Sequence, residues 1–398
     1  MKITAVETIF VPPFDNLLWL RLETDEGAFG LGEACKAPGA VAAYIHDWCA
    51  PRLLGTDPLR IPERLASLQD YLGWGAAGVE TRAVSAVDIA LWDIFGHVHG
   101  RPVADMLGGR ARDSIRTYNT CAGSGYMRKA VGQKAANWAL TTAGDYEDLD
   151  AFLNRADDLA ESLLAEGITG MKIWPFDVAA ERTGGRDISA DELKRALEPF
   201  EKIRRAVGER MDIMVEFHSL WSLPMAKRLA GPLKDYGTYW HEDPFRLDTP
   251  ADIAAYAPHT DAWICVSETL STVHHFRQAL ETGCVGVAMF DLAWCGGFSG
   301  ARKIAALAEA YHVPVAPHDC TGPVGFASGS QFAMHAPNCL IMESVRAFYR
   351  GWYNDLVEGL PTVADGQLSI PERPGHGIAL LPDVKAREGV AVRRSTLD

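Results

Sequence analysis

The strongest constraint on the fold is a repeat that begins near Arg116, where short apolar runs alternate with longer amphipathic segments. Eight runs follow one another over about 250 residues, the usual size of a (β/α)8 barrel, and they read RTYNTC, ITGMKIW, DIMVEF, TYWHE, AWICVSE, VGVAMFD, VPVAPH and CLIMES. The segments between them have the apolar spacing of helices, and residues 189–207 open with the capping-box pair Ser189 and Glu192. Strands that alternate with helices predict a parallel sheet, so residues 114–357 are expected to form a TIM-type (β/α) barrel.

The flanking segments have different patterns. Residues 2–35 alternate as strands do, and residues 41–54, 62–72 and 80–99 have helical periodicity, the last ending before Gly100-Arg101-Pro102. Residues 1–113 are therefore predicted to form an N-terminal α+β capping domain. The segment 358–398 is rich in Pro and Gly and is expected to return to the capping domain and complete it. The predicted fold class is α/β.

Charge and hydropathy exclude several kinds of partner. The formal net charge is −14, whereas nucleic acids and anionic membranes require a basic surface. The N-terminus lacks the continuous apolar region of a signal peptide, and no stretch reaches the roughly 18 apolar residues of a membrane span. We therefore expect a cytoplasmic protein with neither a nucleic-acid nor a membrane partner.

Acids and histidines recur where the predicted strands end. Their successive spacings of 26, 26, 23, 27 and 25 residues equal one strand plus one helix, and they are Glu216, Glu242, Glu268, Asp291, His318 and Glu343. These side chains are expected to meet at the C-terminal mouth of the barrel, where barrel enzymes have their active sites.

Three carboxylates on adjacent strands repel one another unless a cation lies between them. Glu216, Glu242 and Glu268 offer only oxygen ligands, which suits Mg²⁺ best, with Mn²⁺ as the alternative, and argues against zinc. Acids at strand ends also cap helices or pair with lysines, but three in register favour a metal site.

The neighbouring residues favour proton transfer. An Asp such as Asp291 that accepts a hydrogen bond from one imidazole nitrogen of His318 makes the other nitrogen a base that works near neutral pH. Strand alternation places His218 on the same face as Glu216, as a second acid or base. Lys172 lies in an apolar run and either neutralises a substrate carboxylate or extends toward solvent from a buried stem, and Glu343 can bind the same carboxylate.

These parts suit removal of a proton from a carbon next to a carboxylate, where a metal stabilises the enediolate while a base takes the proton.

Several motifs resemble the mandelate racemase branch of the enolase superfamily over nearly the whole chain. They are AVSAVDIALWDIFGHVHGRPVADMLGG (83–109), HEDP (241–244), SE (267–268), FDLAWCGGFSGARKIAALAEAYHVPVAPH (290–318) and DGQLSIPERPGHGI (365–378). Within that branch the chain is most similar to acid-sugar dehydratases of the galactonate dehydratase type, which also carry a His two residues after the first ligand.

The resemblance implies a role for each residue. Glu216, Glu242 and Glu268 would bind Mg²⁺, and His318 with Asp291 would remove the C2 proton of an aldonate or aldarate. His218 would protonate the departing 3-hydroxyl to give a 2-keto-3-deoxy acid, while Lys172 and Glu343 hold the carboxylate. The resemblance also implies a homo-oligomer, and two lid loops over the mouth at 12–16 and 71–79, with substrate contacts expected at Tyr71, Trp74, Trp174 and Trp221.

The sequence departs from the family pattern at four places. Glu216 replaces the usual Asp, His241 stands where the usual motif has Glu, Ser267 replaces Gly, and Trp174 occupies the position of the racemase lysine base. Two alternatives to dehydration are a racemase, epimerase or cycloisomerase that uses the same enediolate, and a non-catalytic barrel that binds a sugar acid.

Overall fold

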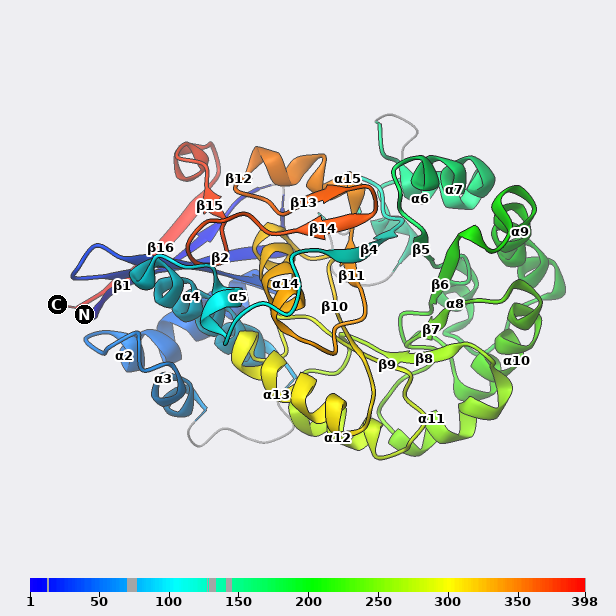
Figure 1. Ribbon diagram of the computed structural model, residues 1–398, viewed down its shortest axis with the longest axis horizontal. Helices are drawn as coiled ribbons and strands as arrows, with labels where there is room; N and C mark the ends of the chain where they lie inside the picture. Colours follow the sequence, from blue (N-terminus) through cyan, green and yellow to red (C-terminus); the bar gives the residue numbers. More distant parts are fainter. Residues whose placement is uncertain (13, 70–76, 127, 129–133, 141–144, 398) are drawn as a thin grey trace.

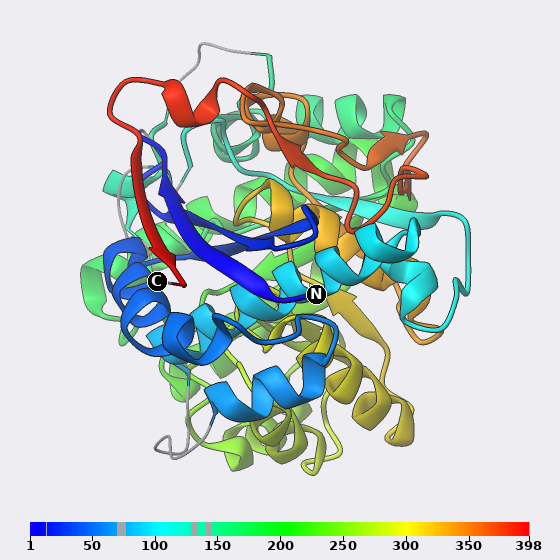
Figure 2. The ribbon, with the colours of Figure 1, turned by 90° about the vertical axis from the view of Figure 1, so that its left-hand side faces the viewer.

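A computed structural model describes residues 1–12, 14–69, 77–126, 128, 134–140 and 145–397. The chain begins with an antiparallel sheet of three strands, β1 (Ile3–Phe10), β2 (Leu17–Thr24) and β3 (Phe29–Cys35). The C-terminal strand β16 (Ala391–Thr396) pairs antiparallel with β1, Ala5 opposite Thr396 and Phe10 opposite Ala391. Both termini therefore lie on one sheet at one end of the molecule (Figures 1 and 2).

Helices cover this sheet in the order that the sequence predicts. They are α1 (Pro38–Tyr44), a π-helical turn (Ile45–Cys49), α2 (Ala50–Leu53), α3 (Ile61–Leu68), α4 (Val79–His99) and α5 (Val103–Met106). The predicted helix at 41–54 is thus three consecutive pieces, which the turn at Ile45–Cys49 joins without a break in helical direction.

The eight predicted barrel strands are all present and all parallel. They are β4 (Ile115–Thr120), β5 (Gly170–Ile173), β6 (Asp212–Glu216), β7 (Trp240–Glu242), β8 (Trp263–Val266), β9 (Val287–Phe290), β10 (Val315–Pro317) and β11 (Met342–Ser344). Strands β4 to β10 pair in chain order, and β11 pairs with β4. The amides of Val315 and Leu340, which donate to Asn338 and Val315, link β10 to the segment before β11 and close the ring.

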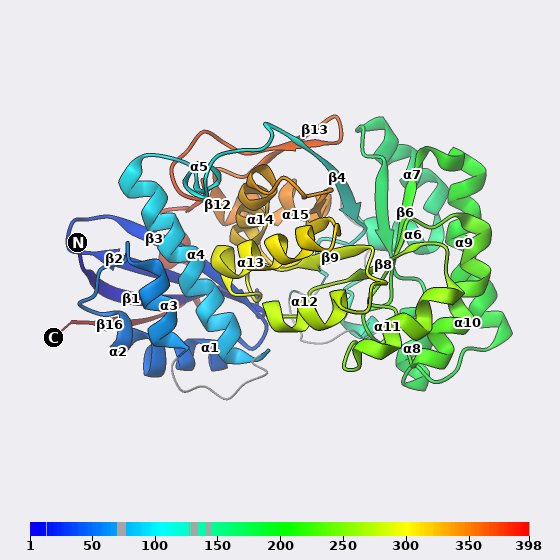
Figure 3. The ribbon, with the colours of Figure 1, turned by 60° about the horizontal axis from the view of Figure 1, so that its bottom comes forward.

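Helices surround this ring on its outside (Figures 1 and 3). They are α6 (Asp148–Asn154), α7 (Ala156–Ala165), α8 (Asp177–Thr183), α9 (Ala190–Val207), α10 (Leu223–Leu233), α11 (Pro250–Tyr256), α12 (Val273–Leu280), α13 (Gly297–Ala310), α14 (Pro323–His335) and α15 (Arg346–Tyr349). The predicted capping box opens α9: the Glu192 amide donates to Ser189 Oγ, and the Ser189 amide donates to the Glu192 carboxylate.

The C-terminal segment crosses from the barrel back to the first sheet. It forms the pair β12 (Val357–Glu358) and β15 (Ala379–Leu380), and the hairpin β13 (Thr362–Ala364) and β14 (Gln367–Ser369), which pairs with β4. It ends in β16 on the N-terminal sheet. The predicted fold class is confirmed: an α/β barrel with an N-terminal α+β cap that the C-terminal segment completes.

Helix α4 joins the cap to the barrel through two buried aspartates. Asp93 accepts hydrogen bonds from the amides of Leu31 in β3 and of His376 in the C-terminal segment. Asp88 accepts from the Ser299 amide at the start of α13, at 3.1 Å. Figure 3 shows α4 between the cap sheet and α13. One helix thus fixes three parts of the chain that are far apart in sequence.

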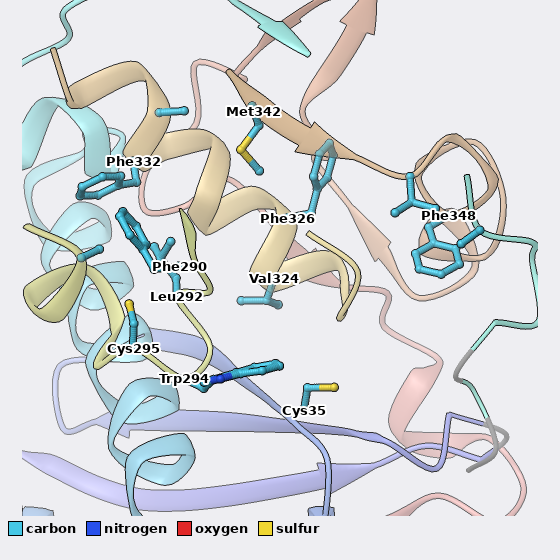
Figure 4. Packing of buried hydrophobic residues seen from close by; sticks show 14 of the residues in the cluster. Cys35, Phe290, Leu292, Trp294, Cys295, Val324, Phe326, Phe332, Met342 and Phe348 are labelled. Carbon is cyan, nitrogen blue, oxygen red and sulfur yellow. The ribbon is translucent and has the colours of Figure 1, made fainter. Parts of the chain in front are cut away.

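A second junction lies where β3 meets α14. Glu33 is buried and accepts hydrogen bonds from Trp19 Nε1 and from the Val324 and Gly325 amides. These two amides lie in the first turn of α14, where the helix itself offers them no acceptor. Figure 4 shows Trp294 and Cys35 between the cap strands and α14. The cap therefore holds the helix that follows the strand of His318.

Close packing of β3 on α4 depends on two glycines. A Cβ built at Gly32 would lie 2.0 Å from the Ala86 carbonyl oxygen, and one at Gly30 would lie 2.0 Å from that of Ala90. Residues two apart in a strand share a face, as do residues four apart in a helix, so the strand and the helix touch along two consecutive turns.

We predict that Gly32→Ala lowers the free energy of unfolding by about 1–3 kcal/mol, because the clash is with backbone and forces α4 to shift. Urea unfolding followed by circular dichroism measures the change. Gly39→Ala is the matched control, since nothing lies within 4 Å of a Cβ at this position in α1. Equal losses in both variants would contradict the proposed close contact.

Candidate active site at the barrel mouth

The six strand-end acids and histidines gather at one end of the barrel, as the spacing predicts. Glu216, Glu242 and Glu343 lie within the last residues of β6, β7 and β11. Asp291 and His318 follow β9 and β10 directly, and Glu268 lies two residues beyond β8. All of them are largely buried, with side chains between 0% and 15% exposed.

Lys172 on β5 lies in the middle of the carboxylates. Its ammonium is 2.8 Å from both Glu242 and Glu343 and 3.6 Å from Glu216. Burial alone would lower the pKa of Lys172, but Glu242 and Glu343 outweigh burial and raise it, so the side chain is charged. Lys172 and Glu343, the residues expected to hold a carboxylate, are thus an ion pair beside the acid cluster.

One ammonium does not balance this cluster. Burial and repulsion by Glu242 raise the pKa of Glu216 well above its ordinary value. Within the described residues no three acid, histidine or cysteine side chains are arranged as metal ligands, and the Lys172 ammonium contacts both Glu216 and Glu242. The expected ligands nevertheless fit Mg²⁺, since they are all carboxylates. The buried negative charge of the cluster also exceeds the single positive charge of Lys172.

Glu268 stands apart from the other two expected ligands. Ser267 Oγ donates to its carboxylate at 2.6 Å, and His318 Nε2 lies 3.7 Å away. Burial alone would raise the pKa of Glu268, but the positive charges of His318 and Lys172 hold it below its usual range. Ser267, which stands where the family usually has glycine, therefore contacts the residue expected to be the third metal ligand.

His318 and Asp291 form the expected dyad. Nδ1 of His318 lies 2.7 Å from Asp291 Oδ2, which directs Nε2 to the opposite side of the ring. Burial would lower the pKa of His318, but Glu268, Glu343 and Asp291 outweigh it and raise that pKa to about 10. The imidazole is therefore held in one orientation and made strongly basic.

His218 has a carboxylate partner that the sequence analysis missed. Its Nδ1 lies 2.8 Å from Oδ2 of Asp177, the first residue of α8. The site thus holds two histidine–aspartate pairs. The only signal for Asp177 is its position shortly after β5, in KIWPFD, where a loop acid is easily taken for a helix cap.

A cavity of about 140 Å³ lies between the two histidines and the cap. His218, Glu268 and His318 line its barrel side, together with Trp294 and Thr321. The cap contributes Phe14, Asn16, Leu17, Cys35 and Lys36, and Arg128 lies in the segment that follows β4. Of the expected lid 12–16, Phe14 and Asn16 therefore reach the site.

Of the four aromatic residues expected to contact substrate, the structure describes two, and both lie outside the cavity lining. Trp174 and Trp221 are each only 1% exposed and are not among the described residues that line the cavity. Trp174 packs against Phe152 and Tyr126 behind the His218 ring. Tyr71 and Trp74 lie outside the described residues.

The unusual histidine of HEDP faces away from the mouth. His241 Nε2 lies 3.0 Å from Thr238 Oγ1 and its Nδ1 lies 2.7 Å from the Tyr256 hydroxyl, on the helix-facing side of β7. Burial lowers the pKa of His241 to about 3. This departure from the family pattern therefore belongs to barrel packing and leaves Glu242 at the mouth.

We predict that Mg²⁺ at a hundred times its Kd raises the free energy of unfolding by about 2.7 kcal/mol, measured by urea unfolding after treatment with a chelator. In Glu216→Gln, which removes one anionic ligand, the same Mg²⁺ concentration should stabilise by less than about 1 kcal/mol. Glu309→Gln on the exposed face of α13 should keep the full effect. Equal stabilisation of all three proteins would exclude Glu216 as a ligand.

Comparisons with known proteins identify the family of this chain. Residues 155–384 match the family "Enolase C-terminal domain-like", and residues 11–108 match "Mandelate racemase / muconate lactonizing enzyme, N-terminal domain". In the part of the chain that the structure describes, no helix is long and apolar enough to cross a membrane.

Named relatives and solved structures cover the whole chain. A D-xylonate dehydratase of Haloferax volcanii is 30% identical over 100% of this chain and 90% of its own. A D-galactonate dehydratase of Ralstonia pickettii is 29% identical over 95% and 92%. The crystal structure of an enolase of the mandelate racemase subgroup from Agrobacterium tumefaciens is 48% identical, with a TM-score of 0.88 over 100% and 99%. The chain is therefore an enzyme of the enolase superfamily and belongs to its mandelate racemase and muconate lactonizing enzyme family.

Proposed function

We propose that this enzyme is a Mg²⁺-dependent dehydratase of an acid sugar, with Mn²⁺ as an alternative metal. It removes the proton next to the carboxylate and eliminates the 3-hydroxyl as water, and the product is a 2-keto-3-deoxy acid. The names of the xylonate and galactonate dehydratases among its relatives support this reaction class.

The observation that carries the proposal is the placement of two histidine–aspartate pairs across one cavity. His318 follows β10 and His218 follows β6, and these strands are four apart in a ring of eight, whichever way the ring is followed. Both histidines line the same cavity. Elimination of water requires a base at C2 and an acid at the 3-hydroxyl, so two such groups on opposite walls suit it.

The two histidines account for both proton transfers of the reaction. Nε2 of His318 takes the C2 proton, and the electron pair left on C2 forms the C2–C3 double bond as the C3–O bond breaks. His218 gives its proton to the departing hydroxyl, which leaves as water. The resulting enol tautomerises to the 2-keto acid.

Glu216, Glu242 and Glu268 are the residues proposed to hold the cation, and Lys172 and Glu343 to hold the substrate carboxylate. When bound, Mg²⁺ supplies positive charge next to that carboxylate, where negative charge develops as the proton leaves. The residues proposed for the cation adjoin those proposed for the carboxylate, since Lys172 contacts Glu242 and Glu216.

A second candidate is an epimerase or racemase in which the two histidines are the two bases. The same opposed placement favours it, because inversion needs a proton removed from one face and returned to the other. A cycloisomerase that uses the same enediolate is a further alternative. Only dehydration accumulates a 2-keto acid.

The direct test is a screen of the Mg²⁺-loaded enzyme against aldonic and aldaric acids, with 2-keto acid trapped as its semicarbazone. Formation of semicarbazone from a subset of configurations is expected. A blank screen combined with exchange of the C2 proton in D₂O would replace dehydration by epimerisation or cycloisomerisation. Binding without exchange or product would indicate a non-catalytic barrel.

We predict that His318→Asn abolishes exchange of the C2 proton, since the amide is no base, while Mg²⁺ affinity stays the same. Proton NMR in D₂O measures exchange, and calorimetry measures Mg²⁺ binding. Exchange at the wild-type rate would remove His318 from the role of base.

His218→Asn should slow dehydration by about 10²–10⁴-fold, the usual contribution of a general acid, and should slow C2 exchange much less. The two rates are measured on the same sample by semicarbazone absorbance and by NMR. Equal losses in both rates would mean that the histidines share proton abstraction.

A further inference from the structure

Two positively charged side chains line the cavity without a role in the reaction proposed above. Lys36 follows β3 of the cap, and Arg128 lies in the segment after β4. Both border the same cavity as His218 and His318. The ion pairs formed within the described part of the chain include neither of them, although most buried arginines, such as Arg346 with Asp148, are paired.

The backbone fixes the position of Lys36. Its φ of 66° is left-handed, and its amide donates to the Asn16 carbonyl at 2.8 Å. The ammonium lies 4.9 Å from the centre of the Trp294 ring, on the wall of the cavity. This side chain is therefore held against an aromatic face beside the substrate space.

Arg128 is held by aromatic rings as well. Its guanidinium lies 4.7 Å from the centre of the Phe14 ring and 5.1 Å from that of Trp352, two rings that stack on each other at 4.6 Å. Its Nε is buried and has no hydrogen-bond partner among the residues that the structure describes. Glu147 and Asp355 attract it only from beyond ion-pair distance.

A half-buried guanidinium with an unsatisfied donor is costly unless a ligand accepts from it. Arginine presents a fork that matches a carboxylate or a phosphate. Both residues contact the same short cap segment: the Arg128 guanidinium lies over the Phe14 ring, and the Lys36 amide donates to the Asn16 carbonyl. They therefore present two cations to the cavity where it borders this segment.

We infer that Lys36 and Arg128 bind a second anionic group at the far end of the substrate. The inference rests on the proposed function in one respect: the substrate carboxylate next to C2 is taken to be held by Lys172 and Glu343. The substrate is then an acid sugar that is anionic at both ends, either a dicarboxylic aldarate or an aldonate with a terminal phosphate.

Calorimetry on the full-length Mg²⁺-loaded enzyme tests this with matched ligands. Each configuration is measured as the hexonate, the hexarate and the 6-phosphohexonate. A doubly anionic member of at least one set should bind at least about tenfold more tightly than its hexonate, as a charge-assisted contact provides. Preference for the hexarate identifies a carboxylate at the far end, and preference for the phosphorylated acid identifies a phosphate.

Arg128→Gln and Lys36→Met should each remove most of that preference, because each weakens binding of the doubly anionic acid more than binding of its hexonate. Arg128→Lys should keep part of it, which shows that charge is the cause. Arg195→Gln, which removes an exposed positive charge from α9 outside the cavity, should keep all of it. Equal affinity within every set, including no measurable binding, or a preference that persists in both variants, would overturn the inference.

Binding and turnover are read separately in this design. A preference that depends on Lys36 and Arg128, without any 2-keto acid, would leave the anion subsite standing and reject dehydration. Formation of 2-keto acid from hexonates without any preference for the doubly anionic acids would do the reverse.

Discussion

Negative charge buried at one end of a parallel barrel is the constraint on which the rest of the site depends. Because parallel strands end at one rim, Glu216, Glu242, Glu268, Asp291 and Glu343 converge away from bulk water. Such a cluster persists only with cations inside it. Lys172 supplies one charge. By themselves the surrounding acids also keep His318 protonated by raising its pKa, and a metal cation among those acids would lower that pKa and free Nε2 to act as a base. A divalent cation would neutralise the remaining negative charge of the carboxylates. Its positive charge would then stabilise the negative charge that develops on a substrate at this rim.

The cap completes the cavity and is fixed to the barrel by buried polar contacts. Helix α4 connects the cap sheet to α13 through Asp88 and Asp93, and Glu33 holds the first turn of α14. These contacts are buried, so the cap segments that carry Lys36 and Phe14 are held in place relative to His318. The barrel thus provides the reacting groups, and the cap provides the wall opposite them.

Much of the fold and the chemical centre could be predicted from the sequence, because both follow from periodicity. Runs of apolar residues located all eight strands, and an acid or histidine at the ends of six of them located the centre. The capping box at Ser189 was predicted because its geometry is local. Asp177 and Arg128 could not be predicted, since both lie in loops whose path depends on tertiary contacts. Lys36 ends a strand of the cap, where no barrel spacing applies.

Aromatic residues show the limit of pattern reasoning. Trp174 and Trp221 occur near strand ends, as pocket residues do, yet the structure buries both of them. A tryptophan beside an apolar run packs equally well on either face of a strand. The cavity instead has Trp294, Trp352 and Phe14, which come from three separate segments. For His241 the pattern and the structure agree. Side chains alternate along a strand, so His241 lies on the helix-facing side of β7 and its neighbour Glu242 faces the mouth.

The most direct measurement is a crystal structure of the enzyme with Mg²⁺ and an unreactive acid-sugar analogue. The account predicts one cation bound by Glu216, Glu242 and Glu268, with the analogue's C2 facing Nε2 of His318 and its 3-substituent facing His218. A cation bound elsewhere, or an analogue whose C2 faces neither histidine, would contradict it.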